Sequence, residues 1–545
     1  MQVLHPIRLP FREMTRDLEA LSARPFDLLV IGGGICGLMA AWDAATRGLR
    51  VAAIDSHDFG GGASFNHHRT LHGGLRYLQS ADLIRFRESV RERRFWARVA
   101  PHLIAPQRFA VEADGARGKS AALLRAGLLA DGWLSADRNA GIDRSLWLAP
   151  GGVVSGAERA AIDTSTLLPD TSSLAVWSDY RTEHAERLTF AVALAASRAG
   201  AALANYVDAI EPIRERRRVI GMMVRDGVGG GRRAIKARVT INAAGGAAGR
   251  LMAAFGVRRP TPLVKAMNVV TTRAAPLVAC GAPAASGRLL FTMPWHNRLS
   301  IGTWHGSEPC GADAGMVTAQ ELASFIQEIN EAFPALKLGD DDIALVQRGI
   351  VPARIRRGQV LLADRPLIRE HRQDGVDGAI SVMGVKYTTA RAAAEYAVTL
   401  AVSQLGGNSV PPQTARLRLP GSLPDGTPPP SKQFDREVWE YLQRIYGADA
   451  QRIAATAIAN PHLAERMTPS LPIIGAQIVE AARNEMAITL EDVVLRRTGL
   501  GAAGYPGDDA VLKVERLMRE QLGWTSSRVQ DEIQLLKEFY LPVHV

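Results

Sequence analysis

The glycine turn Gly32-Gly33-Gly34-Ile35-Cys36-Gly37 constrains the fold of this chain more than any other feature of the sequence. It follows the apolar run Phe26 to Ile31, which predicts a buried parallel strand because such strands read as continuous apolar stretches. Residues 35–47 carry the pattern of a helix and residues 49–54 that of a second strand. Together they form one strand–helix–strand unit, which predicts an α/β fold of the Rossmann type.

The spacing of Gly32, Gly34 and Gly37 is that of a dinucleotide-binding turn. The first glycine allows the tight turn, the second lets a pyrophosphate approach the backbone, and the third lets helix and strand pack closely. Asp55 ends the second strand about 20 residues on, where a carboxylate can accept hydrogen bonds from a ribose diol. A glycine turn without a nucleotide is the alternative. The turn does not separate FAD from NAD, although its place near the start of the chain favours FAD.

Length and composition limit the other choices. A chain of 545 residues exceeds one hydrophobic core, so two or three domains are expected. The net charge of +10 favours anionic partners, which include phosphorylated substrates, acidic lipids and nucleic acid. No basic stripe interleaved with aromatic residues is present, so no nucleic-acid partner is expected. Three cysteines indicate a reducing compartment without a disulfide framework, and Cys36 is expected to be a small buried filler.

The pattern along the chain predicts its organisation. Residues 1–24 form a short helical lead-in, residues 25–410 an oxidoreductase region, residues 411–432 a proline-rich linker and residues 433–545 a helical C-terminal domain. The cofactor-binding parts are expected at about 25–80, 175–260 and 360–410, and the substrate lobe at about 81–174 and 261–359. Neither a signal peptide nor a spanning apolar run is recognised, which predicts a cytoplasmic protein.

Several motifs resemble the FAD-dependent glycerol-3-phosphate dehydrogenases, within the superfamily of FAD oxidoreductases similar to D-amino-acid oxidase. They are the opening IGGGICGLMAAWDAATRGLRVAAID, HGGLRYL at 72–78, APHLIAP at 100–106, INAAGG at 241–246, MPW at 293–295, IGT at 301–303, GVKYTTAR at 384–391 and EDVVLRRTGL at 491–500. The resemblance implies FAD as cofactor, a Rossmann-type FAD-binding domain, an antiparallel-sheet substrate lobe and an all-α C-terminal domain. It also implies oxidation of sn-glycerol 3-phosphate to dihydroxyacetone phosphate, with hydride transfer to flavin N5 and electrons passed on to quinone or another acceptor.

The resemblance further implies which residues form the site. Arg76, Tyr77 and Arg369 would face the substrate, and Lys386 would lie near the flavin or the substrate phosphate. Arginine suits such a phosphate because it makes bidentate contacts. The alternatives are Arg76 in a structural ion pair, Lys386 at the end of a helix dipole or in a salt bridge, and His72 as a buried histidine with satisfied hydrogen bonds. The residues implied to bind the cofactor, besides Lys386 and the glycine turn with Asp55, are Ser64, Arg69, His72, Gly74, Val207, Gly245, Gly384 and Thr388.

Three departures from the family concern substrate identity. The serine-rich turn before the family's lysine reads Phe65-Asn66-His67-His68, followed by Arg69 in place of the lysine. Asn268 stands where the family has a histidine, and an amide cannot act as a general base. Val351 replaces a phosphate-binding arginine, which Arg348 or Arg354 would have to compensate.

Histidines elsewhere are candidates for the missing base, namely His296 and His305. Adjacent histidines such as His67 and His68 rarely hold one ion, so no metal site is expected. The alternatives for function are an amine or 2-hydroxy-acid oxidase or dehydrogenase, and a flavin-binding protein without turnover. The expected partners are a small anionic substrate and an electron acceptor, with peripheral contact to the inner face of the cell membrane as a further option.

Overall fold

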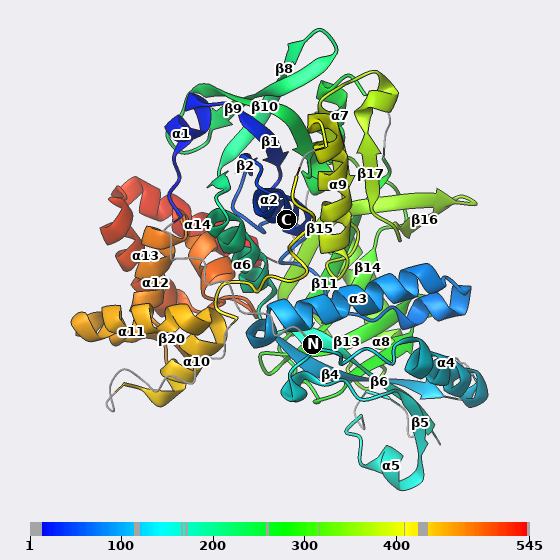
Figure 1. Ribbon diagram of the computed structural model, residues 1–545. Coiled ribbons are helices and arrows are strands. Elements are labelled where there is room, and N and C mark those ends of the chain that lie inside the picture. Colours follow the sequence, from blue (N-terminus) through cyan, green and yellow to red (C-terminus); the bar gives the residue numbers. More distant parts are fainter. Residues whose placement is uncertain are drawn as a thin grey trace.

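The computed structural model describes residues 14–113, 120–164, 167–168, 173–257, 261–314, 317–407, 409–422 and 434–541. Two large β-sheets and a C-terminal group of helices with a small hairpin make up this part of the chain (Figure 1). The predicted fold class is confirmed: a Rossmann-type α/β region, a second lobe built on a largely antiparallel sheet and a helical C-terminal region.

The first sheet is built around the predicted strand–helix–strand unit. β1 (Phe26–Ile31) lies between β10 (Arg232–Asn242) and β2 (Val51–Ile54), and the three strands run parallel. The order across the sheet is β17–β18–β10–β1–β2–β7, with β17 (Leu367–Glu370) antiparallel to β18 (Ala379–Met383) and β7 (Ala202–Ala204) parallel to β2. The carboxyl ends of the parallel strands meet at one edge, which is where open α/β sheets bind ligands.

Both faces of this sheet are buried, which explains the uninterrupted apolar run of β1. Leu28 and Val30 pack on one side, toward α2 (Ile35–Thr46), α6 (Ala185–Arg198) and α9 (Ala390–Leu405). Leu29 and Ile31 pack on the other side, with α1 (Leu18–Ala23), α7 (Ala248–Ala254) and the antiparallel ribbon of β8 (Val207–Glu215) and β9 (Arg218–Asp226). A strand covered on both faces has no polar side to present.

The second sheet forms the other lobe. Its order is β16 (Gln359–Leu362), β15 (Ile343–Arg356), β11 (Leu263–Thr271), β14 (Arg298–His305), β13 (Leu289–Trp295), β12 (Ala279–Pro283), β4 (Ile104–Ala113), β6 (Ser173–Thr182) and β3 (Thr70–Leu71), with β5 (Gly152–Ser155) beside β6. Neighbouring strands are antiparallel except β4 and β12. The helices of this lobe are α3 (Leu83–Val99), α4 (Ala121–Leu134), α5 (Gly156–Ala160) and α8 (Ala319–Ala332).

Two strands of this sheet differ from the expected division into FAD-binding parts and a substrate lobe. β3 and β6 lie in the second sheet, although residues 70–71 and 175–182 were expected in the FAD-binding part. The reason is that strand pairing, rather than order along the chain, decides which sheet a segment joins. The remaining expected domain boundaries stay predictions.

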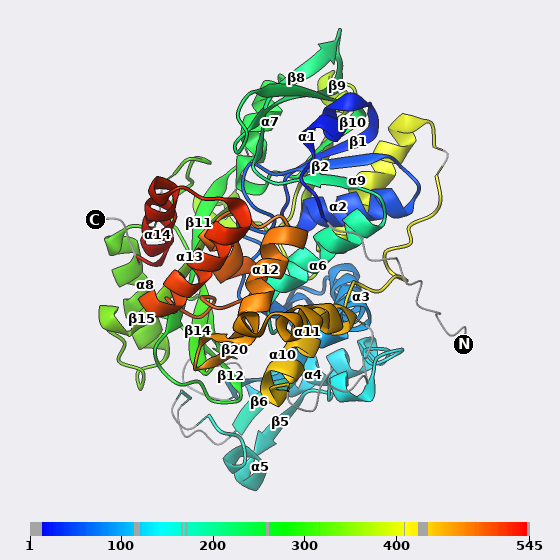
Figure 2. The same ribbon diagram turned by 90° about the vertical axis from the view of Figure 1, so that its left-hand side faces the viewer.

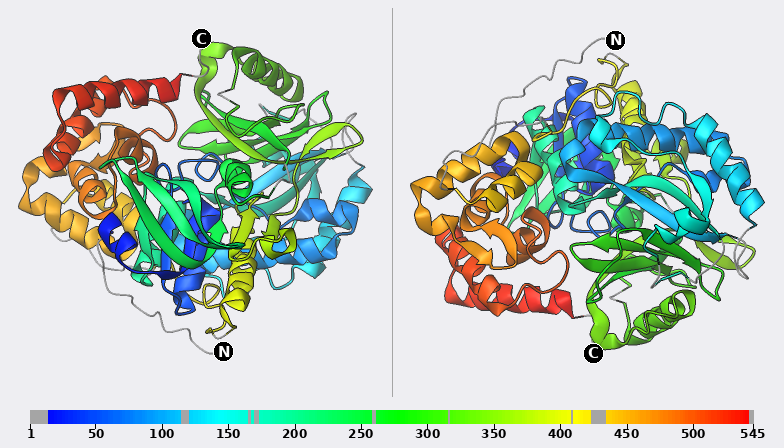
Figure 3. Two further views of the ribbon diagram at one scale, coloured as in Figure 1. Left: turned by 90° about the horizontal axis from the view of Figure 1, so that it is seen from above. Right: turned by 90° about the horizontal axis from the view of Figure 1, so that it is seen from below.

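The C-terminal region has its own core and packs on one flank of the two sheets (Figures 2 and 3). It contains α10 (Arg436–Tyr446), α11 (Ala450–Ala459), α12 (Gly475–Asn484), α13 (Asp508–Leu522), α14 (Ser526–Tyr540) and a π-helical turn, Asp492–Arg497. It is helical apart from one hairpin of β19 (Arg466–Thr468) and β20 (Leu471–Ile474). Residues 423–433 of the expected linker lie outside the described residues. In the described part of the chain, no helix has the length and apolarity needed to cross a membrane.

Candidate active site

The predicted phosphate-binding turn joins β1 to α2. Gly32 has φ +114°, and a Cβ there would lie 2.4 Å from the carbonyl oxygen of Ala243, so only glycine fits. Gly34 precedes the first turn of α2 and supplies no capping side chain. The amide of Ile35 donates to Ser64 Oγ (2.9 Å), which makes Ser64 part of this cradle. The start of α2 thus offers backbone N–H groups and a positive dipole end, which suit a phosphate anion.

Asp55 follows β2 at the same edge of the sheet. Its carboxylate accepts from the amides of Gly33 (2.5 Å) and His57 (2.7 Å), which orient it beside the glycine turn. Burial raises the pKa of Asp55, while these two amide hydrogen bonds lower it. The geometry is that of a carboxylate fixed to accept hydrogen bonds from a diol.

A large cavity extends from this cradle between the two sheets. Its volume is about 2180 Å³, more than twice the roughly 1,000 Å³ at the upper end of ordinary small-molecule sites. The residues predicted to bind the cofactor and those predicted to face the substrate line this cavity, except Gly37, Arg69 and Arg369. An extended dinucleotide together with a second small molecule therefore fits the space, the glycine cradle and the donors present.

The segment Gly74–Ser80 and the loop after β18 bring the predicted substrate-facing side chains together. The ammonium of Lys386 lies 4.2 Å from the centre of the Tyr77 ring. Burial, and next the neighbouring Arg76, lowers the pKa of Lys386 to about 8. His72 contacts this loop through its backbone, since its amide donates to Thr388 Oγ1 (3.2 Å). Burial, then Lys386, Arg76 and Arg93, lowers the pKa of His72 to about 3, so its ring is neutral.

Two predicted site residues are directed elsewhere. Arg69, predicted to bind the cofactor, is buried, and its guanidinium pairs with Glu186 (2.6 Å) and lies 3.9 Å from the centre of the Trp295 ring. Arg369, predicted to face the substrate, makes a bidentate pair with Asp374 at the edge strand β17. In both cases the guanidinium is paired with a nearby carboxylate, and neither residue lines the cavity.

Gly37 does not line the cavity; it lets α2 pack closely on the glycine turn, as the sequence predicts. A Cβ there would lie 1.8 Å from the carbonyl oxygen of Gly32. Cys36 is buried, and burial raises the pKa of its thiol to about 12, which leaves it unreactive as expected for a buried filler.

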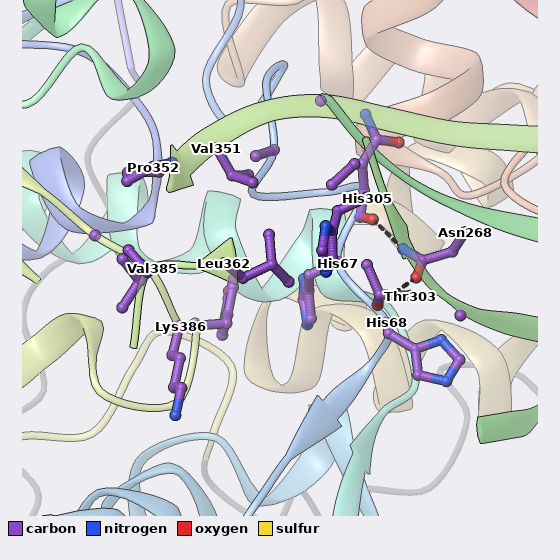
Figure 4. A pocket seen from close by; sticks show the side chains of 18 of the residues that line it. His67, His68, Asn268, Thr303, His305, Val351, Pro352, Leu362, Val385 and Lys386 are labelled. Atoms are coloured by element: carbon purple, nitrogen blue, oxygen red, sulfur yellow. Dashed lines mark hydrogen bonds between the residues drawn. The ribbon is translucent and has the colours of Figure 1, made fainter. Parts of the chain in front are cut away.

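Asn268 lies in the cavity wall with both ends of its amide engaged (Figure 4). Its Nδ2 donates to the carbonyl oxygen of Asn66 (2.9 Å), and its Oδ1 accepts from Thr303 Oγ1 (2.7 Å). The side chain therefore fixes β11, β14 and the Asn66 segment to one another and takes no part in proton transfer.

Val351 also lines the cavity. The two arginines that could compensate for the arginine missing at this position both have hydrogen-bond partners within the protein. Arg348 donates to the carbonyl oxygens of Phe539 (3.1 Å) and Leu541 (3.2 Å). Arg354 pairs with Asp364 (3.0 Å). Arg348 is the better placed of the two to meet an anion, because its contacts are to neutral carbonyls.

Of the two histidines considered as bases, only His305 lines the cavity. His305 lies opposite Ala266 in the pairing of β14 with β11, so its side chain shares a sheet face with Asn268 two residues along. Its Nδ1 lies 3.1 Å from the carbonyl oxygen of Gly306, which can only accept, so Nδ1 carries the proton and Nε2 the lone pair. His296 lies outside this cavity, with its ring 5.0 Å from that of His184.

The sequence did not reveal two features of the site. Phe109, Trp177 and Phe291, from β4, β6 and β13, form an aromatic group on the cavity wall with ring centres 5.5–6.1 Å apart. Asp58, just beyond Asp55, is held by two arginines of the C-terminal region. Period-2 patterning marks a strand face as buried but does not show which strands are neighbours, so neither group was predictable.

Comparisons with known proteins agree with this geometry. The model of the FAD dependent oxidoreductase family matches residues 27–400, and that of the C-terminal domain of alpha-glycerophosphate oxidase matches residues 382–529. Glycerol-3-phosphate dehydrogenase of Synechocystis sp. is 29% identical over 549 residues, covering 96% of this chain and 98% of the relative. The mitochondrial glycerol-3-phosphate dehydrogenase of Mus musculus is 28% identical, covering 97% of this chain and 75% of the relative.

Among solved structures, the glycerol-3-phosphate dehydrogenase from Bacillus halodurans in complex with FAD has the same fold. Its TM-score is 0.72 at 22% identity, with 96% of each chain covered. The L-alpha-glycerophosphate oxidase from Mycoplasma pneumoniae with FAD bound has a TM-score of 0.51 at 15% identity, covering 73% of this chain and 99% of the oxidase.

Proposed function

The chain belongs to the family of FAD-dependent oxidoreductases, and from this premise we propose that it oxidises sn-glycerol 3-phosphate to dihydroxyacetone phosphate. The glycine cradle, Asp55 and Ser64 would hold the dinucleotide, with Val207 and Gly245 beside them and Gly384 and Thr388 further in. When bound, FAD supplies the acceptor for the two electrons that leave the alcohol carbon as hydride.

One observation carries the choice of an anionic substrate. Among the described residues, Arg76, Lys386 and Arg348 line the cavity without an ion pair to a carboxylate, whereas Arg250, Arg288 and Arg354 are each paired with a carboxylate. Arg76 is exposed at the cavity, whereas Lys386 is half-buried. A half-buried cation is costly unless an anion enters, and a phosphate monoester offers the charge and acceptors that it lacks. Arg76 can contact the phosphate with two N–H groups, and Lys386 acts as a point charge.

We propose that His305 Nε2 is the base that accepts the proton of the reacting hydroxyl. This lone pair lies on the sheet face where the family's histidine is replaced by Asn268. Burial lowers the pKa of His305, so the imidazole is neutral near pH 7 and can accept a proton. The alcohol thus loses hydride from carbon and a proton from oxygen, and a carbonyl forms.

The proposal is tested by bleaching of the flavin under anaerobic conditions. Purified yellow protein is mixed with sn-glycerol 3-phosphate, 2-hydroxy acids or amino acids, and absorbance near 450 nm is followed. Glycerol 3-phosphate is expected to bleach the flavin within seconds and the others far more slowly. Bleaching by an amino acid or hydroxy acid alone would favour the alternative oxidase or dehydrogenase, and no bleaching by any of them would favour a flavin-binding protein without turnover.

A membrane quinone is the acceptor that the surface supports best. The helix α4 exposes Leu123, Leu129 and Trp133 to solvent. Ile84 of α3 is exposed as well, by 85%. Arg87 joins the two helices by donating to the carbonyl oxygen of Leu134 (2.5 Å). An apolar helix face with neighbouring arginines suits the interface of an anionic bilayer.

The same helix also contributes to the cavity wall. Leu124 of α4 lines the cavity together with the aromatic group of Phe109, Trp177 and Phe291. A planar quinone entering from a bilayer would meet apolar side chains along this path. The large cavity volume leaves room for it beyond a dinucleotide and a three-carbon substrate.

Vesicle flotation tests this second proposal. Leu129→Ser combined with Trp133→Ser is expected to weaken binding to vesicles of anionic phospholipid and to slow quinone reduction there, with flavin bleaching by glycerol 3-phosphate unchanged. Leu512→Ser with Leu535→Ser, on the exposed C-terminal helices α13 and α14, is the control. Equal vesicle binding by both double variants and the wild type would refute the proposal.

A further inference from the structure

The loop Asp55–Gly60 connects the end of β2 to the cofactor cradle and is fixed on its inner side by the glycine turn. The amide of Gly60 donates to the carbonyl oxygen of Gly33 (2.9 Å), and Gly33 in turn donates to Asp55. Phe59 is buried, and its ring lies 2.6 Å from the position of a Cβ on Gly33. The loop and the glycine turn therefore form one packed unit.

The C-terminal region holds the same loop from its outer side through Asp58. Arg497 makes a bidentate pair with this carboxylate (2.7 and 2.8 Å), and Arg496 adds a further contact (2.7 Å). Asn205 also donates to it (3.1 Å). The side chains of Asp58 and Arg497 are fully buried. Burial would raise the pKa of Asp58, but the two guanidinium groups outweigh it and hold the pKa well below its usual range.

The two arginines are themselves held in place. Arg496 pairs with Asp492 (2.6 Å), and Arg497 donates to the carbonyl oxygen of Glu485 (3.0 and 3.2 Å) and lies 4.0 Å from the centre of the Phe190 ring. They are consecutive residues of a π-helical turn, a rare conformation that often marks a functional site. The turn brings two adjacent arginines onto one carboxylate more than 400 residues earlier in the chain.

We propose that Arg496 and Arg497 are positioning residues for FAD, which act through Asp58 to hold Asp55 and the glycine turn in their binding geometry. The proposal rests on the assignment of this cradle to the cofactor. It gives the helical C-terminal region a role in cofactor retention in addition to its own packing. Asp58, Arg496 and Arg497 are not among the residues that line the cavity, whereas Arg76, Lys386 and His305 are, so the contact is expected to affect the cofactor and not the substrate.

Arg497→Lys is the test, with Arg198→Lys as matched control. Arg198 also joins α6 to the C-terminal region, through Asp449 (2.7 Å), but this pair lies outside both the loop Asp55–Gly60 and the turn Asp492–Arg497. The Kd of FAD for apoprotein, measured by quenching of flavin fluorescence, is expected to rise at least tenfold in Arg497→Lys and less than threefold in Arg198→Lys. With saturating FAD, the KM for glycerol 3-phosphate is expected to stay within twofold of the wild-type value in both variants.

Hydrogen exchange on the wild-type chain tests the same coupling without a substitution. Linkage requires that FAD binding and ordering of the turn Asp492–Arg497 favour each other. Amide exchange of this turn is therefore expected to slow when FAD is added, while exchange in α11 stays unchanged. Equal Kd values in the two variants, or unchanged exchange of the turn, would overturn the positioning role. A wild-type protein that binds FAD but is not bleached by glycerol 3-phosphate would contradict the proposed function alone.

Discussion

Lys386→Met removes a half-buried cation of the cavity that has no acidic partner among the described residues, and it keeps most of the side chain's length. The pKa of Lys386 falls from its ordinary 10.5 to about 8, and at about 1.36 kcal/mol per unit this corresponds to roughly 3 kcal/mol of unfavourable environment for the charge. An incoming phosphate relieves that cost. Loss of one charge-assisted contact is worth about 1.5–3 kcal/mol, so the KM for glycerol 3-phosphate is expected to rise about tenfold to over a hundredfold.

The pKa of Lys386 also predicts the direction in which kcat/KM changes with pH. Below about pH 8 the ammonium of Lys386 is charged and binds the phosphate; as pH rises through this value the charge is lost and kcat/KM falls. The substrate contributes no such change, because a phosphate monoester loses its second proton near pH 6. Bound phosphate raises the pKa of Lys386, so kcat is expected to persist to higher pH than kcat/KM. Lys386→Met is expected to abolish the alkaline fall.

The assay is anaerobic flavin reduction at constant ionic strength from pH 6.5 to 9.5. Lys513→Met is the control and should match the wild type, because Lys513 is a partly exposed residue of α13 that pairs with Glu465 outside the cavity. A wild-type KM that stays level across pH 8, or a Lys386→Met variant with unchanged KM, would refute the assignment of Lys386 to the phosphate.

Four further outcomes follow from the same contacts. Arg76→Met is expected to raise KM but also to move the alkaline fall above pH 8, because Arg76 is the charged group that lowers the pKa of Lys386; an unmoved pH profile would contradict this. His305→Asn should slow flavin reduction about 10²–10⁴-fold, whereas His296→Asn, outside the cavity, should leave the reduction rate of the folded enzyme within about threefold, and equal rates in both variants would remove His305 as the base. Arg369→Ala should leave KM unchanged because its guanidinium is held by Asp374, and a tenfold rise would return it to the site. Gly37→Ala, which places a methyl group 1.8 Å from the Gly32 oxygen, should lower stability by roughly 1–3 kcal/mol and weaken FAD binding, as thermal unfolding and flavin content would show.

The sequence by itself determined the features that depend on neighbouring residues. The glycine turn, the strand before it and the helix after it are local, because φ above zero at Gly32 and the close approach at Gly37 select glycine whatever the rest of the chain does. The motifs around Arg76 and Lys386 likewise identified segments that line the cavity. Apolar patterning indicated the two lobes and the helical C-terminal region, since a buried face must be apolar wherever it packs.

Only the tertiary structure decided where long side chains point and which distant segments meet. Arg69 and Arg369 carry the right charge at matching positions, yet each turns to a carboxylate that the fold places beside it, Glu186 on α6 and Asp374 after β17. The pairing of β11 with β14 singled out His305 from His296, and the packing of the C-terminal region on the loop after β2 joined Arg497 to Asp58. Arg69 and Arg369 pair with carboxylates that lie close to them in the fold. Strand order and helix packing set the distance between each guanidinium and its carboxylate, and no local sequence pattern encodes that distance.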